Sequence, residues 1–375
     1  MPLDLGSLRK GSVGDTLAEF IENAHSKGVA IISAPHNPKY LVPAGLLFSA
    51  LSRTDITAVF YPTYALRQEE GIPTIVFGAS GACSNCVEVL EGGHESVAKK
   101  GGRSVVKVRS PAMTMLKVLE EVVPLKREVK YVTAATILLN HLPRAKSGGL
   151  REWEEEALEY FLVDNTIARV GHPPIMWWGI LQPKEAVERS IDIMIFRYFV
   201  EGAPSEVSEK DVRIRIGDAV EKAPNYAVGQ RWGIRDLTEL AYVLLTLADI
   251  LGPKGVLAAA INPSHALWAS LTFRSAIKDY RKIARELKYG IADRRGRAAI
   301  VTTSCPPPPL TPITIAARGA ELLREDDVVV AECGGKYFVP AQLLPEEAVA
   351  SAWSEGKLEG GYVTVPSLSE LGELF

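Results

Sequence analysis

The chain has 375 residues, about twice the usual size of a single hydrophobic core, so two domains are expected. Hydrophobic residues make up 47% and charged residues 23%, which excludes a disordered or fibrous chain. The formal charge of −3 excludes a bulk basic field, so any contact with nucleic acid would need a local patch. The N-terminus lacks a signal-peptide core, and no apolar run reaches the roughly 20 residues of a membrane span. The lack of a span predicts no membrane partner, and four cysteines, too few for a disulfide scaffold, predict a reducing, cytoplasmic location.

The first 110 residues alternate between helical and strand patterns. Leu17, Phe20, Ile21 and Ala24 recur at helical spacing, and Gly28 can end that helix. Two further helices are expected, one with Pro43 in its first turn running to about Arg53, and one ending near Gly101. Short apolar runs at 29–33, 56–60, 74–77 and 104–108 are predicted to be strands. Alternation of this kind predicts a mostly parallel sheet covered on both faces.

The rest of the chain predicts a helical extension, a linker and a second domain. Residues from 111 to about 200 have helical patterns, and 201–233 is a polar segment with two prolines and four glycines. Helices at 237–251 and 267–287 and strands at 256–261, 298–302 and 328–331 follow. We therefore predict an α/β protein with a doubly wound, mostly parallel sheet and a helical extension in 1–200, a linker at 201–233, and a smaller α/β domain in 234–375.

Open parallel sheets bind ligands beyond the carboxyl ends of their strands, so the loops at 34–42, 78–86 and 109–112 are candidates. An ordinary turn between strand and helix is the simpler interpretation of the first. The second is rich in small residues and could offer N–H groups to an anion, although a tight turn also explains it. It contains a single CxxC motif, Cys83 and Cys86. Cys305 and Cys333 are distant singletons in the sequence, so no four-ligand zinc site is expected.

Basic residues gather in two parts of the sequence. A solvated surface and a groove for phosphates both remain open as explanations. The first cluster comprises Lys99, Lys100, Arg103, Lys107 and Arg109, and the second comprises Lys278, Arg281, Lys282, Arg285, Lys288, Arg294, Arg295 and Arg297.

Residues 28–51 resemble the opening of the DHH phosphoesterases, the RecJ-like superfamily. Their sequence is GVAIISAPHNPKYLVPAGLLFSAL. In that family a strand ends in His-Asn-Pro-Asp-x-Asp or His-x-Asp-x-Asp, and a helix follows. Here the first metal-binding acid falls on Lys39 or Pro38, and the second on Leu41 or Tyr40. Neither alignment leaves a carboxylate at these positions.

The resemblance continues through most of the chain. The strand SVVKV leads into 109–111, where the family carries Asp-His-His, and FLVDNTIAR places Arg169 on the last metal-binding Asp. Residues 239–261 resemble the start of the DHH-associated C-terminal domain. Near the end, 360–362 reads Gly-Gly-Tyr where active members have Gly-Gly-His.

The resemblance implies a protein that has lost catalysis. Without carboxylates the two divalent ions of active members have no oxygen ligands, so we expect no metal, no cofactor and no enzyme activity. A branch of the superfamily of this kind comprises the eukaryotic cell-division-cycle protein forty-five and its archaeal RecJ-like counterparts. These proteins join the GINS complex and the MCM ring in the replicative helicase. The resemblance therefore implies GINS and, through it, MCM as partners.

Single-stranded DNA is a further expected ligand. Lys39, Arg109 and Arg169 replace family acids or the His-bearing loop, and we expect them to converge on the former metal pocket and hold phosphates directly. Arg281 and Arg285 of the second basic cluster are the other predicted contacts. The alternative to phosphate binding is that each of these charged side chains is only part of the solvated surface.

Two other classes of function remain open. The chain could be an active metal-dependent single-strand exonuclease or small phosphodiesterase whose ligands come from other residues. It could also be a sensor that binds a small molecule or nucleotide in the old pocket without turnover. The candidate ligands for the enzyme are His36, His94, Asp164 and Glu332.

Overall fold

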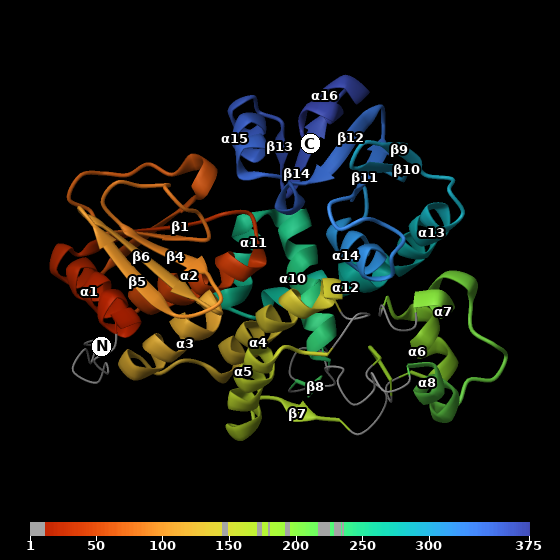
Figure 1. Cartoon of the computed structure of the whole chain (residues 1–375), viewed down its shortest axis with the longest axis horizontal. Coiled ribbons are helices and arrows are strands. Elements are labelled where there is room, and N and C mark those ends of the chain that lie inside the picture. The colour runs from red at the N-terminus through yellow and green to blue at the C-terminus, as the bar shows by residue number, and fades with distance from the viewer. Residues whose placement is uncertain are drawn as a thin grey trace. The chain divides into compact units, whose positions relative to one another are not determined.

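The structure is a computed structural model that describes residues 12–144, 149–170, 175–178, 181–191, 196–216, 226–228, 234 and 236–375. Its elements are labelled in Figure 1. The chain divides into two compact units, Met1–Thr136 with Gly252–Pro263, and Ile137–Leu251 with Ser264–Phe375. Among the residues described, no helix combines the length and apolar character needed to cross a membrane.

The first unit is built on a mostly parallel sheet of six strands with the order β2-β1-β3-β4-β6-β5. Every neighbouring pair is parallel except β5 and β6, which form an antiparallel hairpin at one edge. The buried pattern of β1 and β3 fits strands covered on both faces. The strands are β1 (Val29–Ala34), β2 (Thr57–Pro62), β3 (Thr74–Phe77), β4 (Val87–Glu91), β5 (Ser96–Lys100) and β6 (Arg103–Val108).

Helices of the first unit pack on this sheet and on each other. Helix α2 contacts β1, β2 and β3, and it also packs against α3 and α11. The approach of α2 to α11 is close, because a Cβ built on Gly45 would lie 2.6 Å from the Cβ of Ala260. The helices are α1 (Ser12–Lys27), α2 (Pro38–Leu51), α3 (Pro111–Val122) and α11 (Pro253–Ile261), and α4 (Arg127–His141) runs from this unit into the second.

The second unit contains a mixed sheet with the order β13-β14-β12-β11-β10-β9, in which only β10 and β11 are parallel neighbours. A separate two-stranded sheet pairs β7 with β8. The strands are β7 (Ala168–Arg169), β8 (Tyr226–Ala227), β9 (Asp293–Arg295), β10 (Ala298–Thr302), β11 (Val328–Cys333), β12 (Lys336–Pro340), β13 (Leu358–Glu359) and β14 (Tyr362–Val365).

Helix α10 forms the centre of the second unit. Its residues from Leu237 to Asp249 are buried, and the Tyr242 ring stacks on Phe273 of α12 with centroids 5.7 Å apart. The helices of this unit are α5 (Glu152–Val163), α6 (Pro183–Arg189), α7 (Phe196–Glu201), α8 (Glu209–Ile216), α10 (Leu237–Leu251), α12 (His265–Ser275), α13 (Ile277–Lys288), α14 (Thr311–Gly319), α15 (Glu346–Ser354) and α16 (Leu368–Glu373).

The predicted fold class is confirmed, but several predicted elements are wrong. Residues 87–100 form β4 and β5, not a helix ending near Gly101, because the Gly pairs at 92–93 and 101–102 punctuate two short strands. The predicted strand at 256–261 is helix α11. Pro253 occupies the first turn of that helix, and the alanine-rich run favours the helical state.

Three other boundaries also differ from the prediction. Pro38, not Pro43, opens α2, and Pro43 lies inside the helix. The helix predicted at 267–287 is two helices that meet at Ala276, just after Ser275, whose hydroxyl donates to a backbone oxygen at 2.8 Å. Part of the expected linker is helix α8 and strand β8, while residues 217–225 and 229–233 lie outside the described residues. The domain limits at 200 and 233 stay a prediction.

The cysteines are not distant singletons in the fold. Cys305 pairs with Cys333 and Cys83 pairs with Cys86, with Cα atoms 5.5 and 6.1 Å apart. The Cys305–Cys333 disulfide joins the end of β11 to the residue that precedes the tetraproline 306–309. Cysteine usage therefore gives no support to a reducing location, and the cytoplasmic assignment stays a prediction.

Candidate functional site

The carboxyl edge of the first sheet carries two helix N-termini. After β1, the Asn37 side chain accepts a hydrogen bond from the backbone N–H of Lys39 at 3.0 Å and so caps α2. After β6, the Ser110 hydroxyl accepts from the N–H of Met113 at 3.3 Å and caps α3. Neither helix has an acidic residue in its first turn. The partial positive charge of both N-termini therefore remains at this edge.

Two of the predicted cations belong to the same edge. Lys39 lies in the first turn of α2 and is half-buried, and Arg109 follows β6 and is exposed. The Arg109 guanidinium donates to the backbone oxygen of Gly93 at 3.2 Å. Strands β3 and β4 stand between β1 and β6, so the strand ends that carry these cations are about 14 Å apart at the usual strand spacing. Two phosphates along one nucleic-acid chain can therefore contact the two cations separately.

An aromatic ring occupies this edge at Tyr40, one of the two positions where the family resemblance puts the second acid. The Tyr40 ring lies directly over Gly78, the residue that follows β3, and a Cβ on Gly78 would come 2.5 Å from ring atoms. Gly78 has φ of +73°, which also favours glycine. Burial, and secondarily the negative charge of Glu91 at the end of β4, raises the pKa of Tyr40 to about 12. The ring therefore stays neutral and provides no carboxylate ligand.

Arg169 lies on a different element from the other two cations. It is exposed on β7 and faces Tyr226 of β8 in the two-stranded sheet of the second unit. Burial raises the pKa of Tyr226, and the Arg169 charge opposes that rise. Lys39 and Arg109 thus share one sheet edge, whereas the convergence of all three cations stays a prediction.

Arg281 and Arg285 are used for packing within the second unit. On α13, Arg281 donates to the carbonyl oxygens of Phe199 at 3.0 Å and of Glu188, and Arg285 donates to that of Val200 at 2.7 Å. These carbonyls lie at the ends of α6 and α7, where helices leave acceptors without intrahelical partners. Burial lowers the pKa of Arg281. Both side chains cap neighbouring helices, and their predicted contact with nucleic acid remains untested.

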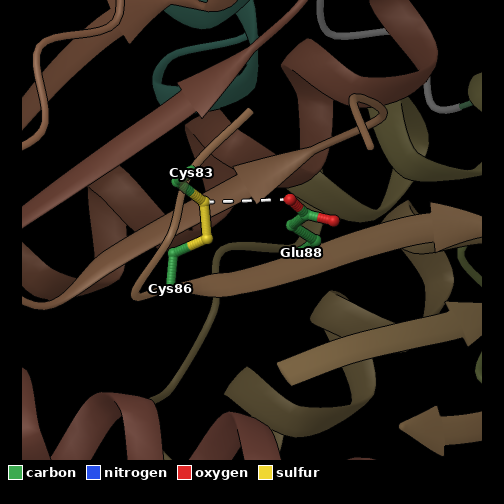
Figure 2. A group of neighbouring side chains, drawn as sticks. All are labelled: Cys83, Cys86 and Glu88. Atoms are coloured by element: carbon green, nitrogen blue, oxygen red, sulfur yellow. Dashed lines mark hydrogen bonds between the residues drawn. A yellow bond between two sulfur atoms is a disulfide. The ribbon is translucent and has the colours of Figure 1, made fainter. Parts of the chain in front are cut away.

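The sequence did not single out Glu88, which organises the loop at 78–86. This loop joins two parallel neighbours, β3 and β4, without a helix. The buried Glu88 carboxylate accepts from the N–H of Gly81 at 2.9 Å and from the Arg103 guanidinium, and the Cys83 sulfur lies 3.9 Å from its oxygen (Figure 2). The Cys83–Cys86 disulfide closes the same loop. Apolar and charged residues alternate at the start of 87–91, and this pattern could have placed Glu88 in a strand.

Within the described residues, one group of potential metal ligands is close enough to share an ion, namely Cys83, Cys86 and Glu88. The two sulfurs are bonded to each other (Figure 2), and a metal binds thiolates, so this group could act only after reduction. Three ligands also fall short of a closed structural zinc site. The group has no part in the family's metal positions, which lie at the carboxyl edge.

The ligands suggested for an active enzyme are not grouped in the described part of the chain. The structure places them on separate elements: His36 in the loop after β1, His94 in the loop after β4, Asp164 at the end of α5, and Glu332 in β11. The Asp164 carboxylate accepts from the N–H of Thr166 at 2.9 Å and ends its helix.

The glycines at 360–361 serve close packing. A Cβ on Gly361 would overlap the carbonyl oxygen of Ala248 and lie 2.6 Å from that of Asp249, near the end of α10. The Tyr362 hydroxyl, at the position of the family's His, donates to the oxygen of Pro308 at 3.0 Å and accepts from the N–H of Leu310 at 3.2 Å. Its hydrogen-bonding capacity is thus directed to the tetraproline segment.

The fold is similar to that of a solved CDC45 structure, in agreement with the sequence resemblance to the RecJ-like superfamily. Among solved structures, CDC45 from Entamoeba histolytica is similar with a TM-score of 0.50, at 10% identity over 94% of this chain and 95% of that one. RecJ from Thermus thermophilus in complex with Mn²⁺ gives a TM-score of 0.41 at 12% identity. That alignment covers all of this chain and 53% of the RecJ chain, so this chain spans about half of its length. No family model and no curated protein matches the chain.

Proposed function

We propose that this chain is a non-catalytic RecJ-like DNA replication factor, a structural component of a replicative helicase. Its partners are the GINS complex and, through GINS, the MCM ring, with single-stranded DNA as a further ligand. The observation that carries the proposal is the Tyr40 ring over Gly78 at the carboxyl edge of the first sheet, with Lys39 beside it and Arg109 on the same edge. The family resemblance puts a metal-binding acid at Lys39 in one alignment or at Tyr40 in the other, and it puts the Asp-His-His loop at 109–111.

The chemistry of this edge supports binding without cleavage. Hard divalent ions need oxygen ligands, whereas Lys39, Arg109 and two helix N-termini repel cations and attract phosphates. A guanidinium or ammonium can hold a phosphate oxygen without an ion as the bridge. The likeness of the fold to CDC45 is compatible with this role.

Pull-down from the native host tests the replication role. The tagged full chain is expected to recover GINS subunits, and MCM subunits only together with them. A variant with Tyr40→Ala should recover the same partners, because the ring is assigned to the sheet edge alone. Recovery of neither complex would remove the main reason for the assignment.

A nuclease assay separates this proposal from the enzyme alternative. With Mn²⁺ or Mg²⁺, the purified chain should not degrade single-stranded DNA, RNA or short oligonucleotides above background. Activity that disappears with a chelator and also in Asp164→Ala would overturn the proposal and establish a metal-dependent phosphoesterase with other ligands.

The salt dependence of DNA binding tests the edge itself. Lys39→Ala combined with Arg109→Ala should weaken binding to single-stranded DNA. The slope of log affinity against log salt should become shallower by about 0.7 for each phosphate contact that is lost. The matched control is Lys100→Ala. That exposed lysine pairs with Arg103 at the opposite edge of the same sheet. Equal slopes for the wild type and the double variant would rule out phosphate binding at the carboxyl edge.

A further inference from the structure

The second unit contains a pocket of about 560 Å³ that none of the predicted functions uses. One wall is the tetraproline 306–309, and other walls come from the last turns of α10 and α12 and from Phe338 and Tyr362. A volume of this size is typical of sites that bind a small molecule or a long side chain. The pocket lies within one unit, so its walls are defined by that unit alone.

The hydrogen-bonding groups of these walls are mostly acceptors. Each proline of the tetraproline has a carbonyl oxygen and no N–H. The hydroxyls of Thr272 and Ser275 donate to helix carbonyls at 3.3 and 2.8 Å, and the Tyr362 hydroxyl donates to Pro308. Their protons are therefore directed to the backbone. Among these groups acceptors are more numerous than available donors, so a ligand rich in N–H groups matches the walls better than an anion does.

The charges around the pocket have one sign. Its titratable lining residues, all described, are Asp249, Asp279, Glu359 and the buried Tyr362, with no lysine, arginine or histidine among them. Both Asp249 oxygens already accept hydrogen bonds, from Thr311 and Gln342, so this buried aspartate contributes charge and no direct contact. The C-terminal ends of α10 and α12 add partial negative charge. The first turn of α13 carries Asp279, which offsets its positive end.

An apolar patch on α12 continues from the pocket. Leu267, Trp268 and Leu271 are 43%, 49% and 58% exposed, and their spacing puts them on one side of the helix. Trp268 belongs both to this patch and to the pocket lining. An indole face at the mouth of a negative pocket favours a cation through the ring quadrupole, and it favours a guanidinium most.

We propose that this proline-walled pocket binds the guanidinium group of an arginine carried by a segment of a partner protein. Apolar residues next to that arginine lie on the patch formed by Leu267, Trp268 and Leu271. The planar guanidinium supplies five N–H donors to a wall of acceptors, and Asp279 and Glu359 supply the opposite charge at the rim. The inference does not rest on the proposed replication role, and it excludes phosphate as the ligand of this pocket.

The wall is held in place at both ends before any ligand binds. The Cys305–Cys333 disulfide anchors the residue before Pro306 to β11. At the other end, the N–H of Leu310 donates to Tyr362, and the N–H of Thr311 donates to Asp249 at 2.7 Å. A preorganised wall reduces the ordering cost of binding.

Calorimetry with two matched peptides tests the proposal. The probe is acetyl-Leu-Arg-Leu-amide, and its control replaces arginine with citrulline, which keeps the shape and removes the charge. Using the full chain, we expect the arginine peptide to bind at least tenfold more tightly. Asp279→Asn and Glu359→Gln should each weaken it by about fivefold, and Trp268→Leu by a similar factor. Both acids are exposed, so these variants should fold normally.

Two control variants separate the pocket from the general surface. Glu347→Gln removes an exposed acid of α15, and Trp353→Leu removes a tryptophan that is 46% exposed on the same helix. Neither lines the pocket, and neither should change the affinity. Equal binding of the arginine and citrulline peptides would overturn the proposal, as would competition by inorganic phosphate. Binding of butylguanidinium as tight as that of the peptide would overturn the assignment to a protein segment.

Discussion

Removal of the Cys305–Cys333 disulfide should cost the second unit several times the free energy of an ordinary surface change. The two cysteines are 28 residues apart in the sequence, and the bond closes that loop in the unfolded chain. In the chain-entropy treatment, a loop of this length is worth about 3.6 kcal/mol at 25 °C. For a unit of this size the loss corresponds to a fall in melting temperature of about 7–14 °C.

The matched comparison is the other disulfide. Cys83 and Cys86 are only three residues apart, so the same treatment gives about 1.6 kcal/mol for that bond. Cys305→Ser with Cys333→Ser and Cys83→Ser with Cys86→Ser would each be unfolded in guanidinium chloride and by heat. The first pair should lose roughly twice as much free energy of unfolding as the second. An equal loss, or no effect of dithiothreitol on the wild type, would refute the assignment of the long-range bond as a stabilising one.

Three further changes test close packing, a buried ion pair and a buried acid. Gly361→Ala should destabilise by about 3 kcal/mol in thermal unfolding because its Cβ overlaps a carbonyl of α10, whereas Gly372→Ala, with open space around it, should not. Glu88→Ala should cost about 2 kcal/mol, since it removes the buried carboxylate that accepts from the Gly81 N–H and from the Arg103 guanidinium. Burial raises the pKa of Asp249 to about 6, so its contribution to stability is greatest below about pH 4 and is lost as pH rises through 6. Denaturation of the wild type against Asp249→Asn at several pH values should show a relative loss of up to about 3 kcal/mol over that range.

Elements with a strong local signal could be predicted from the sequence. The α1 stripe ends at Gly28, which adopts φ of +67°, and β1, β2, β3 and β6 lie within a few residues of the predicted strands. The wrong elements are short apolar runs whose state depends on tertiary contacts. The run at 256–261 forms a helix that packs on Gly45, and nothing in its own pattern distinguishes that helix from a buried strand.

The candidate site was less predictable than the fold. Sequence reasoning placed Lys39 and Arg109 after strands, and parallel topology then puts them at one edge. It could not show that Tyr40 lies over Gly78, because this contact joins the first turn of α2 to a loop 38 positions away. Nor could it show that Arg281 and Arg285 cap helices, since their acceptors are backbone carbonyls more than 80 residues away. Charge alone does not say whether a guanidinium faces water, phosphate or the chain itself.

The two places where the resemblance puts catalytic groups have changed in opposite electrostatic directions. At the sheet edge, acids or the Asp-His-His loop are replaced by Lys39 and Arg109, which disfavour divalent ions. At the position of the Gly-Gly-His, Tyr362 lines a pocket with acidic residues and acceptor-rich walls, which disfavours phosphate. Under the proposed function, either change alone would oppose phosphodiester hydrolysis, one by weakening metal binding and the other by weakening substrate binding. Under the proposed function, aspartates installed at the sheet edge would therefore restore at most the metal and not the reaction. Under the two proposals, one surface binds phosphates and the other binds a basic protein segment, as expected of a scaffold between DNA and protein partners.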